Sequence, residues 1–408
     1  MNTLHRSLEG LVTHLPTHFI SELIASKIAA QGIILSEKQK DRLRQIISRE
    51  DLSHIRIPGW KWWKSQQVEI EITADDIASM EREVDGLVNR LPQILAELSD
   101  QLALNIFRSL QNRWRAESRR QCKEIAAFEK RLGRRWKSPV ELLSMLLTIA
   151  REFGDQTNAR LRGAGESLHL VEVLTRLHAR SCQVTSEIIT LLRSGFGDGA
   201  IARWRTLHEI AVTALFLTEH GEDVAERYLL HEKVESHHAA AQYEKYYQRL
   251  GCEPLDPQEI NELRASCADL IRRYGREFSE PYGWAAGYVS NQKPTFAAIE
   301  QEVGIDHLRP YYKMASHNVH ANPKGVLFKL GLLDQSAMLL AGPSNTGLAD
   351  AGQNAAISLT QVSVALGQLE PTLDTIVVLK ILERLSDEVG VTFVETQARL
   401  ESSEATHE

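Results

Sequence analysis

The residues whose types and spacing could do chemistry together lie in the run Arg203-Trp-Arg-Thr-Leu-His-Glu209. Arg205 and Glu209 are four residues apart, so on a helix they share one face, and His208 directly precedes Glu209. A guanidinium can stabilise the negative charge of a phosphate, while an imidazole or a carboxylate can move protons. The run therefore predicts an acid–base site in which Arg205, His208 and Glu209 line a polar cavity and act on a phosphate group.

The same residues also allow a structural interpretation. The next eight residues, 210–217, are apolar nearly all round, which predicts a buried helix. A carboxylate carried into such a helix needs a partner, because an unpaired buried charge costs several kcal/mol. Arg205 is the nearest partner for Glu209. The alternative hypothesis is therefore a non-enzymatic interaction or sensor module in which Arg205 and Glu209 form a structural ion pair.

A second group of candidates lies in the segment 311–323. Ser316 and His320 are four residues apart and share a helix face. We expect His320 in the last helical turn, where the helix dipole favours the charged imidazolium. It would there serve as a proton donor or an anion-binding group, or, in the alternative, only bond to the final carbonyls. The predicted catalytic residues are Arg205, His208, Glu209, Ser316 and His320.

Two spaced motifs carry a resemblance to a known family. Arg205-x-x-x-Glu209 with its apolar continuation, and Tyr312-x-x-x-Ser316-x-x-x-His320, together resemble the bacterial domain-of-unknown-function family 5677. The resemblance covers roughly residues 140–340, and the loop Tyr282-Gly-Trp284 is consistent with it. It implies a helical domain in which Arg205, Glu209, Ser316 and His320 matter together, and it implies no activity.

A weaker similarity concerns the helical ribonucleases of the HEPN class, which use an Arg followed after four to six residues by a His. Arg203-x4-His208 fits this spacing, but Arg49-x4-His54 fits as well. The helix with Tyr312 and His320 is similar to the last motif helix of this class, yet Ala315 stands where an Arg is expected. The resulting hypothesis is a HEPN-like, RNA-targeting protein of the ribonuclease, toxin or defence type, in which Arg205 supplies the missing charge.

A basic stretch supports RNA as a partner. Between Arg108 and Lys137 the chain has eleven Arg and Lys residues against three Glu, whereas its overall net charge is −7. Such a stretch predicts a phosphate-binding face, although a solvated face or one docked on the acidic remainder is the alternative. The predicted nucleic-acid-binding residues are Arg113, Arg115, Arg119, Arg120, Arg134 and Arg135.

The elements that must position these residues are predicted to be helices. We expect an all-α multi-helix bundle with an additional N-terminal helical region and at most one short strand, at 68–72, where apolar and charged residues alternate. Ser138-Pro139-x-Glu141 is a strong helix start, so we place a boundary there. The expected regions are 1–135, with a Trp-rich loop at 55–63 and the basic helix; 136–395, the bundle; and 396–408, an acidic frayed tail.

Apolar residues recur at spacings of three and four from Ile77 to Leu98, which predicts a helix packed along a seam within the chain or across a homodimer. Pro92 should kink or divide that helix. The homodimer, or another protein partner bound at this seam, is a predicted interaction beside RNA.

Several function classes are disfavoured. The four cysteines are far apart and form no Cys-x-x-Cys pair, so we expect reduced thiols rather than disulfides or a zinc site. Two Glu-x-x-His matches are close to the number expected by chance, so we predict no metal and no cofactor, although His231, Glu235 and His238 would share a helix face. With no apolar run of membrane-spanning length and no signal-peptide pattern, we expect a cytoplasmic protein.

Overall fold

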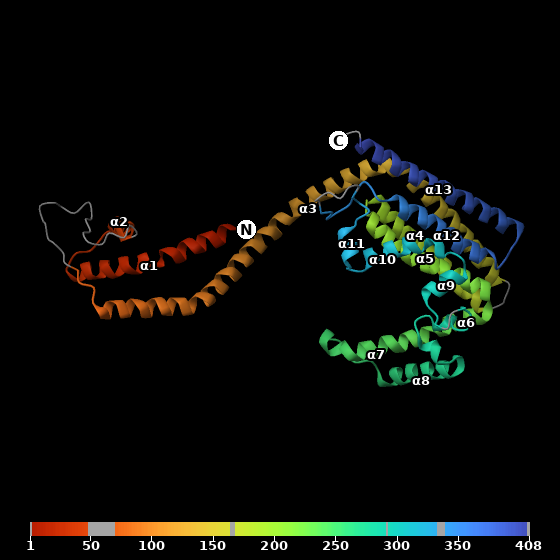
Figure 1. Cartoon of the computed structure of the whole chain (residues 1–408), viewed down its shortest axis with the longest axis horizontal. Coiled ribbons are helices and arrows are strands. Elements are labelled where there is room, and N and C mark those ends of the chain that lie inside the picture. The colour runs from red at the N-terminus through yellow and green to blue at the C-terminus, as the bar shows by residue number, and fades with distance from the viewer. Residues whose placement is uncertain (1, 48–69, 164–167, 291–292, 333–338, 406–408) are drawn as a thin grey trace. The chain divides into compact units, whose positions relative to one another are not determined.

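The computed structural model describes residues 2–47, 70–163, 168–290, 293–332 and 339–405, and every regular element within these ranges is a helix (Figure 1). The predicted all-α class is confirmed. Of the alternating segment 68–72, the last three residues adopt no strand, and the first two lie outside the described ranges. The Trp-rich loop at 55–63 also lies outside them. Contacts divide the chain into two compact units, residues 1–119 and 120–408.

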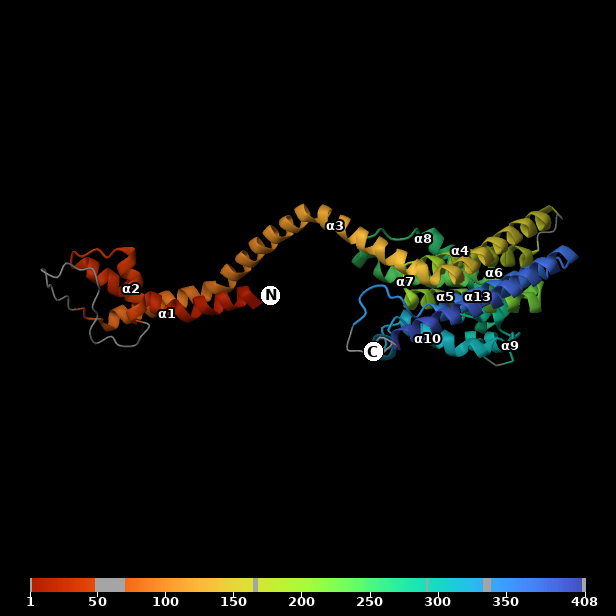
Figure 2. The same ribbon diagram turned by 90° about the horizontal axis from the view of Figure 1, so that it is seen from above.

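The first unit contains α1 (Asn2–Ala30), α2 (Glu37–Ile47) and the beginning of α3 (Ala74–Gly163). The predicted capping box starts α2, since the Ser36 backbone N–H donates to Gln39 Oε1 at 2.9 Å. Figure 2 shows α1 running along the first part of α3. Lys27 ties the two helices together: its Nζ donates to the carbonyl of Glu71 at 2.8 Å and forms an ion pair with Asp76.

The helix α3 is not divided at Pro92, where the sequence predicts a kink or a division, and it does not restart at Ser138, where the sequence predicts a new helix. Pro92 and Pro139 both lie inside its 90 residues. The expectation of a new helix at Ser138 was wrong, and the physical reason is packing. Trp136 and Pro139 are buried in the core of the second unit, and Trp136 Nε1 donates to the carbonyl of Asn345 at 2.9 Å. These contacts stabilise the continuous helix by more than it loses through the backbone hydrogen bond that a proline removes.

The second unit is built from the end of α3 and from the helices that follow it. They are α4 (His169–Arg193), α5 (Gly197–His220), α6 (Glu222–Leu230), α7 (Glu232–Leu250), α8 (Pro257–Tyr274), α9 (Phe296–Glu302), α10 (Arg309–Val319), α11 (Pro323–Leu327), α12 (Ala349–Gly367) and α13 (Leu373–Ala405). Three single 3₁₀ turns lie between α8 and α10: η1 (Arg276–Ser279), η2 (Gly283–Ala285) and η3 (Asp306–Leu308).

The helix α5 forms the centre of this unit, with α4, α10 and α12 packed against it and α13 packed on α12 (Figure 1). Residues 210–217 are buried or nearly so on every side, which confirms the predicted buried helix. Trp204 is fully buried, and its Nε1 donates to Ser358 Oγ of α12 at 3.0 Å. The apolar core therefore holds α5 firmly, and the polar residues on its remaining face are positioned by it.

The two ends of α5 lead to different contacts. Asp198 lies within the first turn of α5, and its carboxylate accepts the backbone N–H of Leu330 at 3.1 Å. After α5 the chain forms α6 and α7, which meet at His231. At the other end of the chain, residues 396–405 continue α13, in which Thr396 and Leu400 are buried.

Candidate functional site

A three-membered polar network joins α5 to α10. Arg205 Nη2 donates to the hydroxyl of Tyr312 at 2.8 Å, and that hydroxyl donates to Glu209 Oε1 at 2.6 Å. The ion pair between Arg205 and Glu209 closes the triangle at 3.1 Å. The Arg205 guanidinium also lies over the Tyr312 ring, 4.8 Å from its centroid. Arg205 and Glu209 thus form an ion pair with each other, and each also has a hydrogen bond with Tyr312.

The electrostatics of this network keep the Tyr312 phenol and the Arg205 guanidinium in their ordinary protonation states. Burial and the hydrogen bond to Glu209 raise the pKa of Tyr312 far above its usual value, so the phenol stays protonated and remains a donor. For Arg205, burial alone would lower the pKa, but the contacts with Tyr312 and Glu209 raise it overall. At neutral pH none of these shifts supplies a group poised to exchange a proton.

A second group of polar side chains, His208, Glu300 and Arg309, lies next to the network, and its first two members are sealed from solvent. His208 Nε2 lies 2.7 Å from Glu300 Oε1, and both side chains are completely buried. Glu300 also forms an ion pair with Arg309, the first residue of α10. Trp204, Phe296 and Tyr312 surround the His208 ring, with centroid distances of 5.2–6.0 Å. His208 therefore links α5 to α9 and has no open side.

The remaining two candidates are separated from these charges. Ser316 Oγ donates to the backbone carbonyl of Tyr312 at 2.9 Å, which stabilises α10 itself. His320 is the exposed residue directly after α10, and its backbone N–H donates to the carbonyl of Ser316 at 3.1 Å. Within the described residues the His320 side chain has no hydrogen bond or ion pair with Arg205 or Glu209.

Three residues of this region were missed as candidates. Tyr312 appeared in the sequence only as part of a family motif, and Glu300 and Arg309 were not singled out. Glu300 follows Ala298 and Ile299, both buried, in the short helix α9. A glutamate at a helix position facing the core is the one signal that could have identified it, because such a carboxylate needs charged partners.

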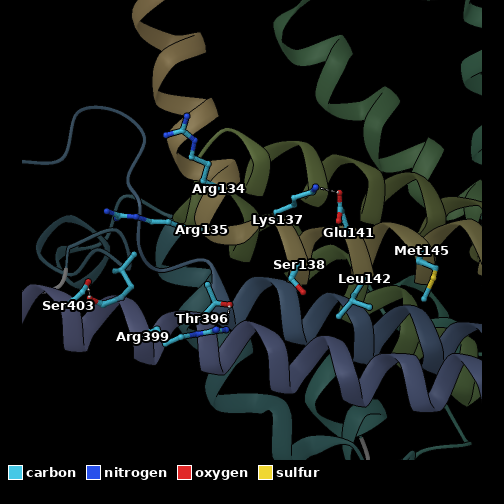
Figure 3. A pocket seen from close by; sticks show the side chains of 11 residues that line it. Arg134, Arg135, Lys137, Ser138, Glu141, Leu142, Met145, Thr396, Arg399 and Ser403 are labelled. Atoms are coloured by element: carbon cyan, nitrogen blue, oxygen red, sulfur yellow. Dashed lines mark hydrogen bonds and ion pairs between the residues drawn. The ribbon is translucent and has the colours of Figure 1, made fainter.

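A basic groove of about 660 Å³ lies between α3 and α13 in the second unit (Figure 3). Its cationic residues are Arg134, Arg135 and Lys137 of α3 and Arg399 of α13, against one carboxylate, Glu141. Its other lining residues are Ser138, Leu142, Met145, Thr396, Leu400 and Ser403. Two of the six predicted nucleic-acid-binding residues thus line a groove, and α13, outside the predicted stretch, adds a fourth cation.

The cations of this groove are weakly neutralised. Lys137 Nζ lies 3.8 Å from Glu141, and Arg399 Nη2 lies 4.0 Å from Glu395, with all four side chains mostly exposed. Exposed pairs at such distances contribute little, so the groove keeps its positive potential. The other four predicted residues are exposed on α3: Arg120 in the second unit, and Arg113, Arg115 and Arg119 in the first.

No arrangement of three or more His, Cys, Asp or Glu side chains that could hold a metal ion occurs within the described ranges. Of the face His231, Glu235 and His238, the first residue is buried, and its Nε2 donates to the carbonyl of Glu280 at 3.0 Å. None of the described helices is long and apolar enough to cross a membrane.

Comparison with known proteins gives one match. No curated protein and no solved structure matches the chain. The model of one family, described as a family of unknown function (DUF5677), matches residues 171–336, which is the segment where the motifs around Arg205 and Tyr312 were found. At residues 171–336 the chain is therefore similar to this family of unknown function.

Proposed function

We propose that the protein binds RNA through the groove between α3 and α13, and that its Arg205–Tyr312–Glu209 network is structural. The observation that carries the proposal is the convergence of Arg134, Arg135, Lys137 and Arg399 on one groove of a chain whose net charge is −7. A cluster of cations in an otherwise acidic protein is an electrostatic footprint for a polyanion.

The groove offers the contacts that a nucleic-acid backbone uses. Arginine presents a planar fork that bonds two phosphate oxygens, whereas lysine acts as a point charge. Each phosphate neutralised in this way releases condensed counterions, which drives binding and makes it strongly dependent on salt. The apolar side chains of Leu142 and Met145, which line the groove, can lie against ribose or base surfaces.

The proposal assigns no RNA cleavage to residues 171–336. A general base needs a group that can reach the substrate and exchange a proton near neutral pH. His208 is completely buried against Glu300, and Tyr312 is held protonated between Arg205 and Glu209. These contacts favour the hypothesis of an ion-pair lock that fixes α10 and α9 on α5, leaving recognition to the basic groove.

The test uses a fluorescently labelled single-stranded RNA of mixed sequence and the full-length protein. The triple variant Arg134→Gln, Arg135→Gln, Lys137→Gln is expected to bind roughly 10–100-fold more weakly than the wild type, with a salt slope lower by about 2–3. The matched control, Lys233→Gln, Arg264→Gln, Arg272→Gln, removes three exposed charges from α7 and α8 and should lose less than about threefold, because non-contacting charges act only at long range. Equal losses in both variants, or no binding by the wild type, would reject the groove.

Gel analysis of total RNA incubated with the wild type and with His320→Ala tests the absence of cleavage. We expect intact RNA in both reactions. If the wild type cleaves RNA and His320→Ala does not, the purely structural interpretation of the Arg205 network is wrong. The hypothesis of a HEPN-like ribonuclease would then be supported. Binding and cleavage are measured separately, so either part of the proposal can fail alone.

A further inference from the structure

The part of α3 in the first unit carries an apolar stripe that is only partly covered. Large apolar residues recur three or four positions apart from Leu91 to Trp114, so they follow one face of the helix. The stripe consists of Leu91, Leu95, Leu98, Leu102, Ile106, Leu110 and Trp114. Leu98 is 46% exposed, Ile106 54%, Leu110 62% and Trp114 59%, although apolar residues grouped on one face are normally covered. The other three members of the stripe are half-buried.

The charges along the same helix are divided into two blocks. Residues 74–100 contain seven acidic and two basic side chains, a net charge of −5. Residues 101–119 contain four Arg and one Glu, a net charge of +3. A parallel pair of such helices would place like blocks side by side, whereas an antiparallel pair places the acidic block of each helix beside the basic block of the other.

We propose that this stripe binds a second copy of the same chain, with the two α3 helices antiparallel about a twofold axis near Leu102. This arrangement brings Leu95 opposite Leu110 of the second copy. Glu97 and Arg108 are eleven residues apart, which is close to three helical turns, so they lie on the same flank of the stripe. In the antiparallel pair Glu97 of each copy meets Arg108 of the other, and each contact occurs twice.

The second copy is the occupant that the charges select, because only a partner with the same two blocks in the opposite direction complements both. The stripe from Leu91 to Trp114 is about 35 Å long at 1.5 Å per residue, which accommodates seven layers of interdigitating side chains. The predicted seam from Ile77 to Leu98 overlaps it only at one end. The proposal does not depend on RNA binding, since the groove residues Arg134, Arg135 and Lys137 lie outside the stripe.

Cysteine cross-linking of the full-length chain tests both the pairing and its direction. In a background with the exposed Cys122 and Cys252 replaced by serine, Leu102→Cys is expected to form a disulfide-linked dimer under mild oxidation, because it lies near the axis. Leu95→Cys alone should remain unlinked, whereas Leu95→Cys with Leu110→Cys should link efficiently. A dimer linked through Leu95→Cys alone would show a parallel pair and overturn the proposal.

Charge exchange provides an independent measurement by analytical ultracentrifugation. Glu97→Arg is expected to weaken the dimer about tenfold or more, because it places two arginines together at both symmetric contacts. Adding Arg108→Glu should restore wild-type association, since the pair is only reversed. A monomeric wild type, or a double variant that is weaker than Glu97→Arg, would reject the arrangement.

Discussion

The Glu300→Ala variant is expected to lose about 3–5 kcal/mol of unfolding free energy, because the substitution leaves the buried His208 ring and the partly buried Arg309 guanidinium without their shared carboxylate. Glu300 is fully buried and is shared by His208 of α5 and Arg309 of α10. Removing its carboxylate therefore breaks the contact with the His208 ring and the ion pair with the Arg309 guanidinium at the same time. Chemical denaturation followed by far-UV circular dichroism measures the change, since nearly all of the described structure is helical.

A matched control lies two residues further along the same helix. Glu302 is partly exposed, and its carboxylate accepts a hydrogen bond from Ser290 Oγ at 3.1 Å, with no ion pair among the described residues. Glu302→Ala should therefore cost less than about 1 kcal/mol, as surface hydrogen bonds usually do. If both variants lost the same small amount, the cluster around Glu300 would not hold α9 and α10 in place.

The burial of the central helix α5 was predictable from its pattern of apolar residues. A run that is apolar on all sides must be buried, and the segment 210–217 follows that rule. The pairing of Arg205 with Glu209 also followed from their spacing on one face. The third member, Tyr312, comes from a helix about a hundred residues later, and no local pattern states which helix packs against which. The Arg205–Glu209 pair could therefore be predicted, but the hydrogen bonds that both residues make with Tyr312 could not.

Local helix signals failed where tertiary contacts opposed them. Ser138, Pro139 and Glu141 form a strong start signal, yet α3 passes through them without a break. The signal describes what an isolated peptide prefers, a matter of about 1–3 kcal/mol. Burial of Trp136, Pro139 and Leu143 in the core of the second unit stabilises the continuous helix by more than that.

The basic groove also combines residues that the local sequence predicts with a residue that only the fold brings close. Arg134, Arg135 and Lys137 were recognisable from composition alone. Arg399 lies more than 250 positions away, inside the segment 396–408 that was expected to be an acidic frayed tail, and only the packing of α13 brings it to the groove. Charge runs thus predict the sign of a surface, whereas its shape and its remaining members depend on the fold.

The second large effect concerns His178 of α4, whose ring is buried beside α3. Its Nε2 lies 3.1 Å from Ser363 Oγ, and that hydroxyl already donates to the carbonyl of Leu359, so Nε2 carries the proton. A Cβ atom at Gly154 would lie only 2.4 Å from His178 Nδ1, which shows how closely the ring fills the space beside this glycine. Burial lowers the pKa of His178 to about 4.

Because the folded-state pKa of His178 is below its unfolded value, near 6.5, the unfolded chain binds more protons between these two values. The stabilising contribution is therefore complete above pH 6.5 and is lost as the pH falls towards 4, by about 3 kcal/mol in total. The variant His178→Gln, which can still bond to Ser363 but does not titrate, should show an unfolding free energy that falls less steeply over this range. Denaturation curves at pH 7, 6, 5 and 4 for both proteins measure the difference, and parallel pH profiles would mean that the buried ring accepts a proton without cost to the fold.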